Sequence, residues 1–205
     1  MFKEKLPKNV LISATTSYAA FKPDANTLIE TGLGQTHLGW LTPCDKHSQQ
    51  AIEVVLSSLL PPSTWHHDIN IALWKKLAIN AVVNPLTAIH QIKNGQLSEP
   101  QYKASILGIC AEIAKVMTTA GYVIDTTELI SDVKQVIDAT ANNYSSMHQD
   151  IAFKRQTEIG FINGYVVNVA TKLKLSVPLN KQLVTQISAL ENNRVELDDI
   201  KFLSK

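Results

Sequence analysis

The alternation of apolar and polar residues divides the chain into a short β-rich beginning and a long helical remainder. Three segments rich in β-branched or aromatic residues predict strands: residues 9–14 (NVLISA), 26–31 (NTLIET) and 35–40 (QTHLGW). Turn-forming residues separate them, first Pro23-Asp24 and then Gly32-Leu33-Gly34, so we expect the last two strands to form a hairpin. Three strands make only a thin sheet.

From residue 47 onward, apolar positions recur with the period of an α-helix. Prolines and glycines mark the predicted ends, because the residue before proline is driven out of helical geometry and glycine favours helix ends. The predicted helices cover residues 47–60, 68–83, 85–94, 100–120, 127–142, 145–174 and 178–191. The expected fold is mostly α with a small β remnant, divided into residues 1–45 and an all-helical domain over residues 46–205.

The predicted helix over residues 68–83 is apolar around nearly its whole circumference, yet it carries a polar stripe. Lys76, Asn80 and Asn84 recur every four residues, and at ~100° per residue each such step drifts by only about 40°. Polar groups within an apolar helix are costly unless they face partners or a wet cleft. Two interpretations stay open here: Lys76 reaches water while the asparagines bond backbone groups, or the stripe lines a cleft. Neighbouring Lys75 is expected in solvent.

A cleft lined by this stripe would suit the reduction of a carbonyl group. A cationic amine can protonate an oxygen on which negative charge develops. Amides along the same stripe can fix the orientation of a small polar substrate. The stripe is therefore the first candidate for chemistry.

A second candidate is the motif Ser145-Ser146-Met147-His148-Gln149-Asp150, at the predicted start of the longest helix. Ser146 and Gln149 fit a capping box. The free backbone amides at such a helix start also offer a carboxylate site, with the serine hydroxyl as a further donor. Charges at i,i+4 spacing follow, an arrangement typical of a solvated surface: Asp150, Lys154 and Glu158.

Composition argues against several classes of protein. The 205 residues hold 19 Lys and Arg against 18 Asp and Glu, a net charge of +1 that offers no field for nucleic acid or an anionic membrane. An apolar fraction of 45% excludes disorder, and no run approaches the roughly 18 apolar residues of a membrane span. The start MFKEKLPKNV has no signal-peptide stretch, and two cysteines cannot form a disulfide framework, so we expect a cytoplasmic protein. The histidines show no metal-ligand spacing, so no metal site is expected.

The two motifs together resemble those of the ketopantoate reductases (2-dehydropantoate 2-reductases). The matching segments are residues 73–88 (LWKKLAINAVVNPLTA), 145–150 (SSMHQD), 157–159 (TEI), 162–164 (ING) and 177–180 (VPLN). The resemblance covers roughly residues 9 to 190. It implies a helical domain like that of the 6-phosphogluconate dehydrogenase-like reductases, joined to the last strands of a Rossmann-type domain.

The resemblance also implies an activity: the reduction of ketopantoate to pantoate with NADPH, in pantothenate and coenzyme A synthesis. Lys76 would be the proton donor to the ketone oxygen of this small 2-oxo acid. The matching substrate-binding positions are Asn80, Asn84, Asn94 and Ser146, and the matching NADPH contacts are Glu158 and the backbone of Ala20.

The chain departs from the family by lacking its glycine-rich dinucleotide motif, because Gly32-x-Gly34 has no third glycine. Met1 therefore resembles a late start, and we expect the chain alone to be inactive. Two other functions stay open: a non-catalytic helical interaction module derived from such a reductase, or a reductase of a related 2-oxo acid. Exposed strand edges at the start also predict a homodimer.

Overall fold

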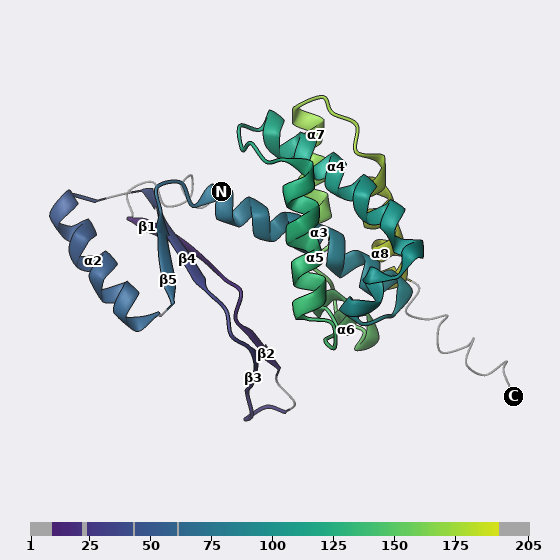
Figure 1. Cartoon of the computed structure of the whole chain (residues 1–205), viewed down its shortest axis with the longest axis horizontal. Helices are drawn as coiled ribbons and strands as arrows, with labels where there is room; N and C mark the ends of the chain where they lie inside the picture. The colour runs from purple at the N-terminus through teal and green to yellow at the C-terminus, as the bar shows by residue number, and fades with distance from the viewer. Residues whose placement is uncertain (1–9, 22–23, 43, 61, 193–205) are drawn as a thin grey trace, which may run out of the picture. The chain divides into compact units, whose positions relative to one another are not determined.

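The computed structural model describes residues 10–21, 24–42, 44–60 and 62–192 (Figure 1). The chain divides into two compact units, Met1–Leu73 and Trp74–Lys205, rather than at residue 45. Residue 9, the first of the predicted strands, lies outside the described residues. None of the helices in the described ranges has both the length and the apolar character needed to cross a membrane.

The first unit is built on a long antiparallel ribbon (Figure 1). Its strands are β1 (Leu11–Thr16), β2 (Ala19–Phe21), β3 (Ile29–Gly32) and β4 (Thr36–Thr42). β1 pairs with β4, and β2 pairs with β3. The three predicted strands therefore exist as β1, β3 and β4, but the predicted hairpin between the last two is wrong, and β2 was not predicted.

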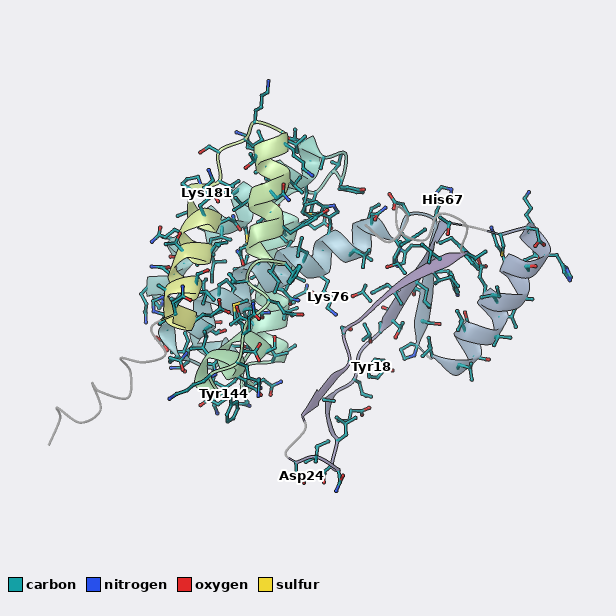
Figure 2. All side chains as sticks on the ribbon, turned by 180° about the vertical axis from the view of Figure 1, so that it is seen from behind. Tyr18, Asp24, His67, Lys76, Tyr144 and Lys181 are labelled. Atoms are coloured by element: carbon teal, nitrogen blue, oxygen red, sulfur yellow. The ribbon has the colours of Figure 1, made fainter. Side chains whose placement is uncertain are left out.

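Gly34, between β3 and β4, marks a close approach of two backbone segments and not a reversal of the chain. A Cβ atom on Gly34 would lie 2.2 Å from the backbone nitrogen of Tyr18, in the link between β1 and β2, so only glycine fits there. The ribbon turns at Asp24 instead, at its tip (Figure 2). The Asp24 Oδ1 accepts the backbone N–H groups of Asn26 and Thr27 at 2.8 and 2.9 Å.

A helix and a further strand complete the first unit. Helix α2 (Lys46–Leu59) follows β4 as predicted, and Asp45 caps it by accepting the backbone N–H of Ser48 at 3.0 Å. The unpredicted strand β5 (Ser63–His66) pairs in parallel with β4, which gives the sheet order β1-β4-β5. A strand of four residues is too short for a clear period-2 pattern, which explains why the sequence did not reveal it.

The second unit is helical. Its elements are α3 (Asn70–His90, whose first residues fall in the first unit), η1 (Asn94–Ser98), η2 (Pro100–Tyr102), α4 (Lys103–Thr119), α5 (Thr126–Ala139), α6 (Ser146–Ala152), α7 (Asn163–Lys172) and α8 (Pro178–Asn192). Apolar side chains of these helices form one core, and every residue from 81 to 88 of α3 is buried. The middle of α3 is therefore the centre of this unit.

Helix α3 runs unbroken through Pro85, where two separate helices were predicted. Proline has no backbone N–H, so the carbonyl of Ala81 loses its usual donor four residues along the helix. The side-chain Nδ2 of Asn163, on α7, donates to that carbonyl at 2.8 Å, and Asn163 is fully buried. A neighbouring helix thus supplies the hydrogen bond that proline removes.

Asn163 belongs to a chain of polar groups that joins four helices. Its Nδ2 also donates to the Oδ1 of Asn180 on α8 at 3.0 Å, and the Nδ2 of Asn180 donates to the Oε2 of Glu112 on α4 at 2.8 Å. The Glu112 carboxylate also accepts the backbone N–H groups of Leu179 and Asn180, in the first turn of α8. Because the Glu112 carboxylate can only accept hydrogen bonds, the Nδ2 groups of Asn180 and Asn163 are the donors along this series of polar groups.

The long helix predicted over residues 145–174 is wrong, because α6 and α7 are separate. Lys154 takes a left-handed φ of +56°, which ends the helical path after α6. The backbone N–H of Thr157 then donates to the Oε1 of Glu191 on α8 at 2.6 Å. The helical period of the sequence predicted one helix. The contact of Thr157 with Glu191 instead holds the intervening segment in a non-helical conformation.

Candidate active site

The polar stripe lies on α3, and its exposure falls along the helix. Lys76 is exposed, Asn80 is half-buried and Asn84 is 7% exposed. Figure 2 shows the Lys76 side chain projecting from the ribbon of α3. The stripe therefore extends from the surface of the second unit to the edge of its core.

The carboxamides of Asn80 and Asn84 make no hydrogen bond within the described residues. Neither carboxamide has a polar atom that is fully buried, so solvent reaches both groups. The interpretation in which the asparagines bond backbone groups is therefore wrong for the described residues. Two amides held on an apolar helix without protein partners are suited to bind a polar ligand.

The two adjacent lysines of α3 have different environments. The Nζ of Lys75 lies 2.5 Å from the Oε1 of Glu128 and 3.6 Å from the Oδ2 of Asp132, both on α5. The hydrogen bond to Glu128 is the main cause that raises the pKa of Lys75. Lys75 is thus engaged in an ion pair on the surface instead of being simply solvated, and Lys76 is the lysine of the stripe.

Ser145, and not Ser146, caps α6. The Oγ of Ser145 accepts the backbone N–H of His148 at 3.0 Å and lies 2.7 Å from the Oγ1 of Thr87 on α3. The predicted capping box of Ser146 with Gln149 is wrong, because the buried contact with Thr87 selects the earlier serine. Ser146 is the first residue of α6, and its exposed hydroxyl makes no hydrogen bond in the described part of the chain.

The contact between Thr87 and Ser145 joins the start of α6 to α3 less than one turn beyond Asn84. Thr87 is fully buried, and sequence reasoning missed it, although it stands three residues after Asn84, on a neighbouring part of the helix surface. Helix α6 has only seven residues, so its dipole is small. What its start offers to a ligand is therefore the Ser146 hydroxyl. The start of α6 is therefore held against α3, three residues beyond Asn84.

Asn94 connects the start of η1 to the loop that follows α5. Its Nδ2 donates to the Oγ1 of Thr140 at 2.9 Å, and its backbone N–H donates to the carbonyl of Asn143 at 3.0 Å. The Oδ1 of Asn94 is buried without a partner among the described residues. The amide nitrogen is thus engaged in the framework, and only the oxygen remains for a ligand.

The two predicted NADPH contacts lie in different units. Ala20 is exposed on β2, opposite Glu30 on β3. Glu158 is exposed in the segment between α6 and α7. Asp150, on α6, makes an ion pair at 2.9 Å with Arg155 of that segment. The described residues contain no group of three or more His, Cys, Asp or Glu side chains that could hold a metal ion.

The described residues form two open hollows, neither of which the stripe lines. One, of about 550 Å³, is in the first unit, between β1, β4 and the end of α2. The other, of about 230 Å³, lies between α4 and the start of α5. Lys76, Asn80, Asn84 and Ser146 line neither of them. In the second unit, the candidate residues therefore range from the exposed Lys76 and Ser146 to the buried Asn84 and Asn94.

Comparison with known proteins identifies close relatives over most of the chain. Residues 68–191 match the family described as "Ketopantoate reductase PanE/ApbA C terminal". The chain is 40% identical over 190 residues to the 2-dehydropantoate 2-reductase of Vibrio cholerae, covering 93% of this chain and 64% of that protein. It is 38% identical over 196 residues to that of Yersinia pestis, covering 93% and 62%. The chain therefore spans about three fifths of the length of these curated relatives.

Solved structures share the fold. A D-mandelate dehydrogenase, solved with NADH and anilino(oxo)acetate, matches with a TM-score of 0.81 at 23% identity, over 89% of this chain and 60% of that one. A PanE/ApbA family ketopantoate reductase from Ralstonia eutropha matches with a TM-score of 0.76 at 22% identity, over 89% and 59%. These similarities confirm the predicted fold class, a small β part followed by a helical domain.

The start of α6 contains a buried histidine whose protonation we expect to affect stability. His148 is 8% exposed, and its ring stacks on Tyr144 with 4.4 Å between the ring centroids. Burial is the main cause that lowers the pKa of His148 from its usual 6.5. As the pH falls through about 6.5, the unfolded chain therefore gains a proton that the folded chain does not yet bind.

We expect the free energy of unfolding to fall between pH 7 and pH 5, with His148→Gln flattening this dependence. His37, whose pKa burial and His66 also lower, contributes to the wild-type slope, so the informative quantity is the difference between slopes. Denaturation with urea at several pH values measures it, with the exposed His67 changed to Gln as the control. A wild-type slope in His148→Gln would contradict the assignment.

Proposed function

The chain belongs to the ketopantoate reductase family, and from this premise we propose that it carries the substrate-binding and catalytic part of an NADPH-dependent reductase. The proposed reaction converts 2-dehydropantoate to pantoate, on the route to pantothenate and coenzyme A. One observation carries the proposal: on an otherwise apolar helix and in line with Lys76, the carboxamides of Asn80 and Asn84 have no hydrogen-bond partner among the residues that the structure describes.

Each residue of the proposed site has a role that follows from its chemistry. The Lys76 ammonium group protonates the ketone oxygen as that oxygen gains negative charge. Asn80 and Asn84 bind the oxygen functions of the substrate and hold its ketone in place. Ser146 donates its hydroxyl to the substrate carboxylate, and Asn94 would accept from a substrate hydroxyl once its buried Oδ1 is uncovered.

The dinucleotide that supplies the hydride in such reductases does not find a complete site in these residues. A pyrophosphate needs a glycine-rich turn leading into a helix, and the 205 residues contain no Gly-x-Gly-x-x-Gly. Gly34 packs against the backbone of Tyr18, so it is not a phosphate cradle. Ala20 and Glu158 are the contacts that this chain would add to a site completed elsewhere.

Two other functions make use of the same helical unit in different ways. A reductase of a related 2-oxo acid uses the same lysine and amides, because these groups recognise the oxo-acid portion that such substrates share. A non-catalytic interaction module is disfavoured, since a packing surface has no use for two unpartnered amides at the edge of a core.

The first test is binding of 2-dehydropantoate to the full chain, measured by isothermal titration calorimetry. We expect Lys76→Ala and Asn84→Ala to weaken binding about tenfold or more, because each removes a hydrogen-bonding group from the ligand. Lys75→Ala is the matched control, since Lys75 pairs with α5, and it should leave the dissociation constant unchanged. Equal effects of Lys75→Ala and Lys76→Ala would exclude a specific role for Lys76.

We further expect that the chain alone neither binds NADPH at micromolar concentration nor reduces 2-dehydropantoate. The reason is the missing glycine-rich turn. Fluorescence titration with NADPH, followed by an assay of its oxidation, measures both. Micromolar binding together with turnover would show that the incomplete site is sufficient, contrary to the proposal.

We also propose that the chain forms a homodimer through the first unit. Within the described residues, β1 pairs only with β4 and leaves its other edge open, and α2 has no buried residue. Three apolar side chains of α2 are more than half exposed: Val54, Val55 and Leu59. Open edges and apolar faces of this kind favour self-association. Light scattering should therefore show a dimer, and a clean monomer at tens of micromolar would disprove it.

A further inference from the structure

We propose that Asn163 is a positioning residue for the candidate substrate site. By binding the carbonyl that Pro85 leaves without a donor, it keeps α3 helical at Asn84 and so fixes the direction of the Asn84 carboxamide. This inference rests on the proposed function of Asn84 as a substrate contact. Asn163 itself is fully buried and touches no substrate in this proposal.

Asn84 occupies the least favourable position of α3. It directly precedes Pro85, and the proline ring clashes with a preceding residue in the helical conformation. Pro85 also removes one hydrogen bond from the helix. Yet α3 is continuous from Asn70 to His90, with Asn84 in its interior. The helical state of Asn84 therefore needs support from outside α3.

Asn163 provides this support with a defined donor. Its Nδ2 lies 2.8 Å from the carbonyl oxygen of Ala81 and 3.0 Å from the Oδ1 of Asn180. Both of these oxygens are acceptors. The Asn180 amide turns its oxygen toward Asn163 because its Nδ2 donates to Glu112 at 2.8 Å. Only a side chain with two N–H groups can serve both acceptors, which is what an asparagine amide has.

A second tie holds the other side of Asn84. The Oγ1 of Thr87 lies 2.8 Å from the carbonyl oxygen of Val83 and 2.7 Å from the Oγ of Ser145. Asn84 thus lies between a turn held by α7 and a turn held by α6. Its carboxamide makes no hydrogen bond in the described ranges, so the helical backbone, which sets the Cα–Cβ direction and the allowed rotamers, is the main constraint on where that group points.

The test is a cycle of variants of the full chain, made with Asn163→Ala, Pro85→Ala and the double variant. In Pro85→Ala, the new backbone N–H can bond the Ala81 carbonyl, so Asn163 is no longer needed there. We expect Asn163→Ala to weaken binding of 2-dehydropantoate about tenfold when Pro85 is present, and less than about threefold when it is replaced. The same loss in both backgrounds would overturn the proposal.

A control separates positioning from general loss of stability. Val133→Ala removes buried methyl groups from α5, at a residue that makes no contact assigned to the site. It should lower the midpoint of denaturation while leaving the dissociation constant unchanged. If Asn163→Ala fails to fold, Asn163→Ser takes its place in both backgrounds. The expectations are the same, because the serine side chain is too short to bond both acceptors.

A readout without ligand keeps this inference distinct from the proposed function. The side-chain amide resonances of Asn84 in a ¹H–¹⁵N spectrum should shift in Asn163→Ala and return toward their original position in the double variant. If wild type does not bind 2-dehydropantoate but these shifts occur, the proposed substrate is wrong and the positioning stands. Unchanged Asn84 resonances in Asn163→Ala would overturn the positioning, whatever the ligand does.

Discussion

The hydrogen bond from Asn163 to the carbonyl of Ala81 is the contact on which the helical unit depends. It lets one helix pass through Pro85 at the centre of the core, where a proline would otherwise break it. Lys76 and Asn80 precede that point, while Asn84 adjoins it and Thr87 follows it. A break there would separate the candidate proton donor from the contact that joins α3 to α6. We therefore infer that this buried amide supports the continuity of the site, together with the contact of Thr87 with Ser145.

Four asparagines of this unit form two pairs, which differ in how their side-chain nitrogens are used. Asn163 and Asn180 are fully buried, and both engage their amides with neighbouring helices and with Glu112. Asn80 and Asn84 retain carboxamides without partners in the described ranges. Burial of amides is tolerated in the first pair because their nitrogens are satisfied. The second pair has no such structural use, which is why we assign it to a ligand.

Sequence reasoning found what depends on neighbouring residues and missed what depends on distant ones. The spacing of Lys76, Asn80 and Asn84 placed them on one stripe, since four residues make nearly one turn. The course of α3 through Pro85 depends on a donor 82 residues away, and the choice of Ser145 as cap depends on Thr87, 58 residues away. The wrongly predicted hairpin has the same origin, because Gly34 makes room for the backbone of Ser17 and Tyr18, between β1 and β2. No local propensity contains these contacts.

The most direct test of this account is to observe the Asn163–Ala81 hydrogen bond itself. Nuclear magnetic resonance can detect scalar coupling across a hydrogen bond, here between the Asn163 side-chain nitrogen and the Ala81 carbonyl carbon. We expect a measurable coupling and slow exchange of the Asn163 amide protons with solvent, because the group is fully buried. Absence of the coupling, together with fast exchange of these protons, would contradict the central claim.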